Sequence, residues 1–368
     1  MTRWAKQVAD RNEAIALAGR WRVIRPLNGA GPVLTMADGT EAVSFASNDY
    51  LGLSQHPAVR CAAVAAIERW GTGAGSARLV VGDRPVHHDL EAAIAEWKRS
   101  EAALLFSTGY AANLGVLTAL GTDGVLVVSD ERNHASIVDG CRLAKARVAI
   151  SRHADVGHVG ELIAAHDGPA MVVTDTVFSM DGDVADLPGL SAVCGEAGAL
   201  LVVDEAHDVL GPAWTPPDGL DVLRVGTLSK TLGSLGGFAA GSRAFIDLLI
   251  NAARSFIFTT APSPADIAAA AASLAVLRSP HGIELVDRLR SHVGRIQPGH
   301  TSPIVPVVIG GERAVLAAAE RLLADHRLVV PAIRPPTVAP GTSRLRIALS
   351  ASHTDDHVDR LATALAGI

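Results

Sequence analysis

The stretch ALLVVDEAH, residues 199–207, joins a short run of aliphatic residues to two acids and a histidine. An apolar run of this length without alternation is typical of a strand covered on both faces, as in a parallel sheet. Similar runs recur at 102–106, 124–130, 146–151, 170–176, 221–227 and 236–241. Helix-like segments such as 109–120 and 187–198 separate most of them. The alternation predicts an α/β fold with a mainly parallel, seven-stranded sheet covered by helices.

The pattern changes after about residue 266. An alanine-rich, helix-like segment at 266–279 is followed by strands and helices at a different spacing. We therefore expect an N-terminal segment over residues 1–40, a large domain over 41–275, and a smaller α+β domain over 276–368.

Composition and charge restrict the class of partner. The 368 residues carry a net charge of −6, so no global field attracts nucleic acid or an anionic membrane. The three cysteines, Cys61, Cys141 and Cys194, lie far apart and fit neither a zinc site nor a disulfide framework. The N-terminal stretch lacks an apolar signal core, and no run approaches the ~20 apolar residues that span a bilayer. We expect a soluble cytoplasmic protein that binds small molecules and no metal.

Polar side chains follow four of the predicted strands. His134 comes after 124–130, Ser179 after 170–176, and Lys230 after 221–227, while Asp204 and His207 close the opening stretch. Ligands of open parallel sheets bind beyond the carboxyl ends of the strands. These residues are therefore the candidate site.

Two nucleotide-binding interpretations fail on the residues themselves. DEAH, at 204–207, occurs in ATPases, but these also need a glycine-rich loop ending in G-K-[ST], and SKT at 229–231 lacks the preceding glycine. GTGAGS at 71–76 has serine where the dinucleotide motif needs its last glycine, and it follows a helix-like segment. Neither site is supported.

A lysine, an aspartate and histidines at neighbouring strand ends suit pyridoxal 5′-phosphate. Its aldehyde bonds to a lysine amine, and a buried carboxylate keeps its pyridine nitrogen protonated. Lys230 and Asp204 supply these groups, His207 can hydrogen-bond the ring hydroxyl, and His134 can stack on the ring. Taken singly, a solvated lysine, a capping aspartate and a core histidine are simpler interpretations. Their conjunction favours the cofactor.

The cofactor phosphate needs backbone amides at a helix start together with hydroxyl donors. Gly109 and Tyr110 begin the helix-like segment at 109–120, and Thr227 ends the strand before Lys230. We expect these three residues to hold the phosphate.

Eight blocks, in order along the chain, resemble the α-oxoamine synthases, pyridoxal-phosphate enzymes of the aspartate aminotransferase fold (fold type I). The blocks are SNDYLGL (47–53), GTGAGSARLVVGDRPVHHDLE (71–91), FSTGYAAN (106–113), NHASIVDGCRL (133–143), VFSMDGD (177–183), VVDEAH (202–207), TLSKTLGSLGG (227–237) and PPTVAPGTSRLRIALSASHT (335–354). The resemblance covers the chain from about residue 40 onward.

The resemblance implies a role for each matching cofactor residue. Lys230 would form the Schiff base, Asp204 would pair with the pyridine nitrogen, His207 would contact the ring oxygen, and His134 would stack on the ring. Ser179 and Thr227 would be further cofactor contacts, all within the large domain.

Other matches concern the substrate and the partner subunit. Arg346 matches the residue that grips the amino-acid carboxylate, and Asn48 matches a substrate-side residue. Family members build their sites across a homodimer interface, so Thr259 or Thr260 would reach the phosphate of the neighbouring subunit.

The resemblance also implies the reaction, a decarboxylative condensation of an amino acid with an acyl thioester. The stretches 227–238 and 256–265 resemble most the members that join L-alanine to a pimeloyl thioester on the route to biotin, with pimeloyl-CoA or a pimeloyl carrier protein as donor. Sister reactions use glycine with acetyl-CoA, glycine with succinyl-CoA, or serine with palmitoyl-CoA. These alternatives share the fold and the cofactor and differ only in their pockets.

One departure from the family pattern follows His207. The family continues with glycine and a glycine-rich run that ends near an arginine, whereas this chain has Asp208 and a proline-rich segment, 211–221, without that arginine. Altered loop geometry at the site, or a catalytically silent protein that keeps the fold, is the expectation this departure adds.

Overall fold

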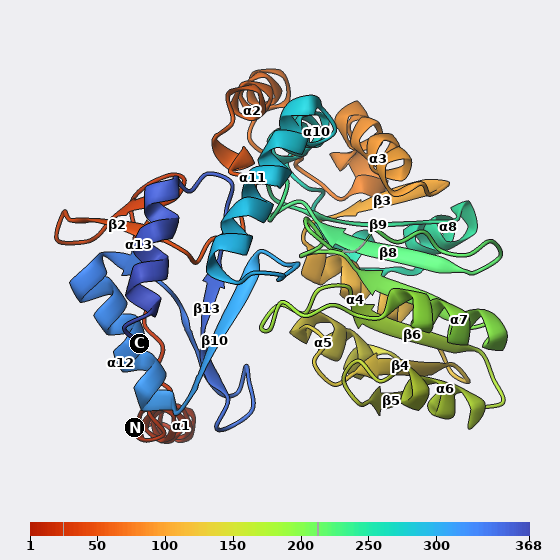
Figure 1. The fold of residues 1–368 in the computed structure, drawn as a ribbon. Helices are drawn as coiled ribbons and strands as arrows, with labels where there is room; N and C mark the ends of the chain where they lie inside the picture. Colours follow the sequence, from red (N-terminus) through yellow and green to blue (C-terminus); the bar gives the residue numbers. More distant parts are fainter. Residues whose placement is uncertain (25, 212) are drawn as a thin grey trace.

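The structure is a computed structural model, and it describes residues 1–24, 26–211 and 213–368. Figure 1 shows a large sheet flanked by helices, with β10 (Ile304–Gly310) and β13 (Ser343–Ala348) of a second, smaller sheet beside it. Within the described part of the chain, no helix is long and apolar enough to cross a membrane.

The large sheet has seven strands in the order β3-β9-β8-β7-β6-β4-β5. They are β3 (Ala102–Phe106), β4 (Leu126–Asp130), β5 (Arg147–Ser151), β6 (Ala170–Asp175), β7 (Leu200–Asp204), β8 (Val222–Thr227) and β9 (Gly237–Gly241). Each lies within one of the seven runs quoted above, so the predicted mainly parallel sheet is confirmed. β9 alone is antiparallel to its neighbours, because the chain returns from β8 through residues 228–236, too short a connection for a crossover.

Helices cover both faces of this sheet. One face carries α4 (Gly109–Leu120), α5 (Ala135–Leu143), α8 (Arg243–Ala252) and α9 (Arg254–Ile257). The other face carries α3 (Pro85–Lys98), α6 (Val156–Ala164), α7 (Leu187–Ala197) and α10 (Pro264–Leu277), with α2 (Pro57–Trp70) packed on α10. Val127, Val173 and Val202 point into one apolar layer and Val128, Val172 and Val203 into the other, which explains the unbroken apolar runs.

The smaller part of the molecule is built from two three-stranded sheets and three helices. β10 and β13 pair with β12 (Ala332–Ile333), and β1 (Val33–Thr35) and β2 (Glu41–Ser44) pair with β11 (Leu328–Val329). The helices are α11 (Pro280–Ile296), α12 (Glu312–His326) and α13 (Asp355–Leu365). Short helical turns at η1 (Leu53–Gln55) and η2 (Arg78–Gly82) complete the elements, with α1 (Arg3–Leu17) fully exposed.

The N-terminal part of the expected large domain contributes to the small-domain core. Phe45 and Tyr50 lie in one hydrophobic cluster with Leu289 of α11 and Ile347 of β13. The chain therefore passes through the smaller part before it enters the large sheet. The boundaries at residues 40 and 275 stay a proposal.

Candidate active site

Lys230 lies on the short loop between β8 and β9. The turn closes with a hydrogen bond from the amide of Gly233 to the Lys230 carbonyl, 2.9 Å long. Gly233 has φ of +57°, and a Cβ there would come within 2.4 Å of the Ser54 amide nitrogen. The glycine run therefore lets the lysine loop lie directly against the segment that contains Asn48 and Tyr50.

The Lys230 amine begins a chain of hydrogen bonds. Its nitrogen lies 2.9 Å from Nε2 of His207, whose Nδ1 lies 2.6 Å from the Tyr50 hydroxyl. The Tyr50 hydroxyl in turn donates to Oδ1 of Asn48 over 3.1 Å. If His207 is neutral with its proton on Nδ1, every donor in the chain has an acceptor.

Burial and nearby charge support that proton assignment. Burial, and then the positive charges of Lys230 and Arg346, hold the pKa of His207 well below its usual range. Burial raises the pKa of Tyr50 to about 12, so its hydroxyl keeps its proton. Burial also lowers the pKa of Lys230, with Arg346 acting in the same direction. The amine is thus closer to its neutral, nucleophilic form than a surface lysine is.

Asp204 ends β7 and is 6% exposed. Nδ2 of Asn113 on α4 donates to its Oδ2 over 2.6 Å and to the Ser136 hydroxyl over 2.9 Å. The same hydroxyl lies 2.7 Å from Nδ1 of His134, which caps α5. Asp204 and His134 are therefore joined through two neutral groups. Burial and the positive charge of Lys230 lower the pKa of His134.

A second buried carboxyl lies beside Asp204. Asp175 ends β6, pairs in register with Asp204, and accepts the backbone amide of His134 at 2.8 Å. Burial and the neighbouring charge of Asp204 raise the pKa of Asp175 well above its usual range. The charged form of Asp175 is therefore disfavoured beside Asp204.

Arg346 brings β13 of the smaller part into the site. Its Nε donates to the Ser179 carbonyl at 2.5 Å, and both terminal nitrogens lie 3.3 Å from Oδ1 of Asn48. Ser179 meets Arg346 through its backbone carbonyl and not through its side chain. Arg346 and Asn48, both predicted to lie on the substrate side and separated by most of the chain, thus meet in one cluster with Tyr50.

The helix start at Gly109 lies against the end of β8. A Cβ on Gly109 would lie 3.2 Å from Cβ of Thr227, and one on Gly237 would lie 2.5 Å from the Gly109 amide nitrogen. The Thr227 hydroxyl donates to the Gly236 carbonyl over 3.0 Å. The start of α4 therefore lies directly beside the Thr227 hydroxyl, and a helix start together with a hydroxyl suits an anion.

Three of the predicted residues lie away from this cluster in the single chain. Tyr110 is 43% exposed, and its hydroxyl donates to Asp139 on α5. Thr259 and Thr260 follow α9 on a loop whose neighbour Ala261 bonds to the Ser76 carbonyl. Their assignment to a phosphate remains a proposal.

Asp208 follows His207 directly in the chain. Burial, and then the charge of Glu205, raise the pKa of Asp208 to about 7. Glu205 forms ion pairs with Lys98 at 2.6 Å and with Arg224. Asp208 therefore interacts with the charged group of Glu205, Lys98 and Arg224. The contacts that join Lys230 to His207 and Asp204 to His134 remain in place.

Three residues of the site were not singled out from the sequence. Asp175 lies near the end of the run 170–176 and could have been found by the same strand-end argument that selected Asp204. Asn113 and Tyr50 lie in quoted blocks, but a neutral amide on a helix and a buried tyrosine carry no local signal of function. Only packing brings them to Asp204 and His207.

Three charged groups of the site have no ion pair. Within the described residues, Lys230, Asp204 and Arg346 each lack an opposite charge within 4.0 Å, although Asp204 and Arg346 are both 6% exposed. Buried charges are normally paired. A ligand that is cationic near Asp204, reactive toward the Lys230 amine and anionic at Arg346 would pair all three, and Asn113 Oδ1, buried without a partner, adds a free acceptor.

Comparison with known proteins places this site in context. The model of the family "Aminotransferase class I and II" matches residues 40–365. An 8-amino-7-oxononanoate synthase from Anaeromyxobacter dehalogenans is 46% identical, over 97% of this chain and 94% of that protein, and one from Geobacter sulfurreducens is 42% identical, over 99% and 98%. A solved serine palmitoyltransferase from S. paucimobilis with bound PLP-myriocin has a TM-score of 0.91 at 27% identity, covering 100% of this chain and 98% of that one. The family match spans every residue of the cluster.

Proposed function

The chain belongs to the aminotransferase class I and II family, and from that membership we propose that it is a pyridoxal-phosphate-dependent acyltransferase of biotin biosynthesis. It condenses L-alanine with a pimeloyl thioester and releases 8-amino-7-oxononanoate, the thiol and carbon dioxide. The name shared by relatives that are 42% and 46% identical over nearly the whole chain supports this reaction.

The residues of the site fit the cofactor. Lys230 offers an amine with a lowered pKa, and Asp204 offers a buried carboxylate without a cation. His207 lies 2.9 Å from the Lys230 amine, and His134 is joined to Asp204 through Ser136 and Asn113. The start of α4 with Thr227 suits the phosphate. When bound, pyridoxal phosphate draws electrons from the α-carbon of the amino acid and so makes loss of its proton, and later of its carboxylate, feasible.

The chain's own residues bind and orient the substrate. The Arg346 guanidinium holds the carboxylate of L-alanine, for which its planar fork is suited. Asn48 Oδ1 lies 3.3 Å from both terminal nitrogens of Arg346, so the incoming carboxylate displaces or shares this contact. Asn48 thereby keeps the buried cation satisfied before substrate arrives.

Lys230 moves the proton. Its amine takes the α-proton of alanine, since burial lowers its pKa and so favours the neutral form that accepts a proton. His207 Nε2, 2.9 Å away, accepts a hydrogen bond from that amine and restricts its direction. A carbon–carbon bond then forms between the α-carbon and the thioester carbonyl, the thiol leaves, the carboxylate leaves as carbon dioxide, and a proton returns to the α-carbon. His134 is placed to hydrogen-bond the oxygen of the former thioester.

A basic cavity near Arg346 supports a phosphate-bearing acyl donor. It measures about 900 Å³ and is lined by Arg11, Arg20, Arg22 and Arg334. Ala332, also in its wall, pairs with Leu345, the neighbour of Arg346. Clustered guanidinium groups suit the phosphates that coenzyme A or a carrier-protein arm carries. Either pimeloyl-CoA or a pimeloyl carrier protein is therefore the proposed donor.

Exposed apolar residues support a homodimer. Trp4, Val8 and Leu17 of α1 are more than half exposed, as are Val80 and Val81 of η2. Large apolar side chains this exposed favour burial against another subunit. In such a dimer Thr259 or Thr260 would complete the phosphate site of the partner subunit. We also place the protein in the cytoplasm, where its free cysteines stay reduced.

Lys230 follows β8 and Asp204 ends the adjacent strand β7, and neither side chain forms an ion pair within the described residues. This arrangement is the observation that carries the function. The test is to supply the purified protein with pyridoxal phosphate, L-alanine and pimeloyl-CoA and to detect the amino-ketone and carbon dioxide. Glycine and serine, and acetyl-, succinyl- and palmitoyl-CoA, serve as competitors. Turnover of another pair in preference to alanine and pimeloyl-CoA would overturn the substrate assignment.

A second experiment tests the shared site. Light scattering reports whether the particle has twice the chain mass. Mixed dimers of Lys230→Ala and Thr260→Ala chains should then recover part of the activity that each variant lacks, if Thr260 serves the partner's site. A monomer with full activity would contradict the dimer proposal.

A further inference from the structure

Residues 177–184, between β6 and α7, form a closed loop that touches the smaller part of the molecule. The amide of Phe178 donates to the Asp183 carbonyl over 2.9 Å, and the Gly182 amide donates to the Phe178 carbonyl over 2.8 Å. Gly182 has φ of +70°, and a Cβ there would lie 2.1 Å from the Ile304 carbonyl oxygen. The loop therefore lies directly against the start of β10.

The tip of this loop holds Arg346. Ser179 supplies the carbonyl that accepts from Nε of Arg346 at 2.5 Å. Asp181 pairs with Arg344, two residues earlier on β13, and also with Arg132 at 3.3 Å. The direction of the Arg346 guanidinium is thus set by the loop on one side and by Asn48 on the other.

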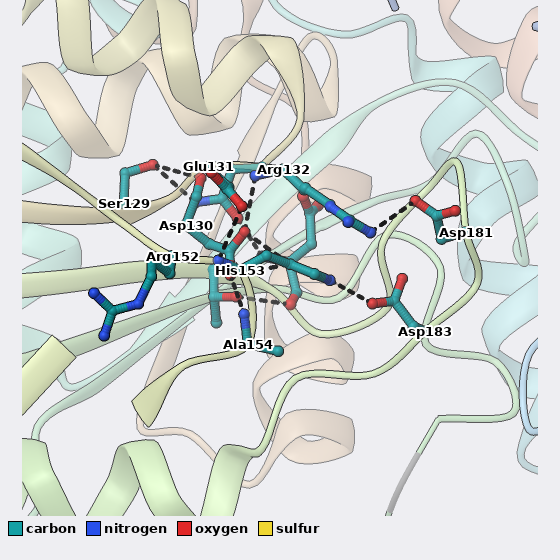
Figure 2. A network of polar contacts seen from close by, with 12 residues as sticks. Ser129, Asp130, Glu131, Arg132, Arg152, His153, Ala154, Asp181 and Asp183 are labelled. Atoms are coloured by element: carbon teal, nitrogen blue, oxygen red, sulfur yellow. Dashed lines mark hydrogen bonds and ion pairs between the residues drawn. The ribbon is translucent and has the colours of Figure 1, made fainter. Parts of the chain in front are cut away.

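The base of the loop is held by a histidine between two carboxylates. Figure 2 shows His153 with Nε2 2.6 Å from Oδ2 of Asp183 and Nδ1 3.0 Å from Oδ1 of Asp130. Its ring also meets the buried Phe178 ring edge-on, with the centroids 4.5 Å apart. Both ring nitrogens of His153 therefore lie within hydrogen-bonding distance of a carboxylate oxygen, one at the end of β4 and one on the loop.

The other carboxylate is itself anchored. Asp130 ends β4, and it accepts the backbone amides of Arg132 and Ala154, each at 2.8 Å. The amide of His153 lies 3.3 Å from Oε1 of Glu131. His153 is therefore anchored to the large sheet through Asp130, and it holds Asp183 of the loop in turn.

We propose that His153 is a positioning residue for Arg346: by holding the base of the 177–184 loop against β4, it aims the guanidinium at the carboxylate of the amino-acid substrate. This inference rests on the proposed role of Arg346. Site geometry must be held to a fraction of an ångström, and a loop tied at its tip alone does not provide that. His153 touches no substrate and acts only through the loop.

The test compares two ligands on the pyridoxal-phosphate-loaded protein by calorimetry: L-alanine, and L-alaninamide, which lacks the carboxylate. In His153→Gln the dissociation constant of L-alanine rises roughly tenfold, the loss expected for one charge-assisted hydrogen bond, and that of L-alaninamide changes less than about twofold. KM for L-alanine follows, while KM for pimeloyl-CoA stays within about twofold. His166→Gln is the matched control, because His166 contacts the Gly124 carbonyl beyond the other end of β4.

Arg346→Lys separates the inference from the function on which it rests. If Arg346→Lys binds L-alanine as the native protein does, the proposed role of Arg346 fails. If Arg346→Lys weakens L-alanine binding and His153→Gln does not, the positioning role fails and the function stands. Equal weakening of both ligands by His153→Gln would also overturn it, since that result indicates a general loss of structure.

The loop offers a second pair of variants should His153→Gln not fold. Asp183→Ala removes one of the two contacts and weakens L-alanine binding about threefold, whereas Asp183→Asn, whose amide oxygen still accepts from Nε2, stays near native. Hydrogen exchange at the amides of Phe178 and Gly182 accelerates roughly tenfold in Asp183→Ala. Native binding and native exchange in Asp183→Ala would contradict the proposal.

Discussion

His207 and His153 are both partly or fully buried, and both ring nitrogens of each are hydrogen-bonded, yet their surroundings are opposite. Lys230 and Tyr50 flank His207, and burial with nearby cations keeps its pKa well below the usual range. Asp130 and Asp183 flank His153, each with a carboxylate oxygen within 3.0 Å of a ring nitrogen. His207 accepts a hydrogen bond from the Lys230 amine, whereas His153 links the end of β4 to the 177–184 loop.

The two regions differ in how their charges are balanced. Around His153, acids and bases satisfy one another within the chain, including the Asp181 pairs with Arg132 and Arg344. Around His207, Lys230, Asp204 and Arg346 lack ion pairs among the described residues. A buried charge without a partner has an energetic cost that a ligand can relieve. Unpaired charge therefore marks the reactive region, and paired charge marks its support.

The largest difference between the two regions concerns Lys230. Lys230→Ala should lower turnover at least about 10⁴-fold, because the amine both bonds the cofactor and moves the α-proton. Borohydride reduction should attach the cofactor to the native protein and not to the variant, as read by mass spectrometry. Lys145→Ala, on an exposed lysine, is the control. A reduced cofactor still attached to Lys230→Ala would refute the assignment.

Asp204 is the next most sensitive position. Asp204→Asn keeps the shape and the Asn113 contact but removes the negative charge, and kcat should fall roughly 10²- to 10³-fold. The cofactor absorbance and single-turnover rate report the effect. Asp221→Asn, an exposed acid before β8, should leave both unchanged. Native turnover in Asp204→Asn would mean that another group keeps the cofactor ring charged.

Tyr50→Phe interrupts the chain on the His207 side. It leaves the buried Nδ1–H of His207 without an acceptor, which should lower the free energy of unfolding by about 1–3 kcal/mol in a urea titration. Turnover should fall by about tenfold or less, because Lys230 remains in place. Combined with Asp183→Ala, the two unfolding losses should add within ~0.5 kcal/mol, as expected for regions without a shared contact. A larger coupling would show that the two histidine regions are not independent.

The smallest expected effect concerns Asp208, which follows His207 in the chain and lies near the ion pairs of Glu205. Its folded-state pKa of about 7 lies above the ordinary value of 3.8. From about pH 4 to 7 the unfolded chain therefore loses this proton while the folded chain keeps it, and stability falls as pH rises. Asp208→Asn removes that loss, so the variant should gain about 1–2 kcal/mol over the native protein between pH 4 and 7. If Asp208→Asn and the native protein differed in stability by the same amount at pH 4 and at pH 7, the raised pKa of Asp208 would be contradicted.

Much of the large sheet could be predicted because strand signals are local. Seven aliphatic runs became seven strands, and Asp204 and Lys230 were selected because carboxyl ends of parallel strands share an edge. The antiparallel direction of β9 was not visible, since an apolar run has no direction and only the short connection after Lys230 sets it.

The remaining parts of the site depend on contacts between distant segments. Asn48 and Tyr50 pack with the smaller part and reach His207 across the junction. The role of Ser179 as a cofactor contact stays a prediction, and the contact of its backbone carbonyl with Arg346 was not indicated by any local pattern. No pattern in the sequence indicated a role for His153, because a histidine next to an arginine is typical of an exposed segment.

From its residues alone the chain could be read as an α/β enzyme with a lysine and an acid at neighbouring strand ends, because aliphatic runs and strand-end polar groups act over a few residues. Folding alone decided which charges stay unpaired, which groups flank each histidine, and where the guanidinium of Arg346 points. Those properties depend on burial and on contacts between segments that lie from 23 to 298 residues apart, and no local pattern encodes them.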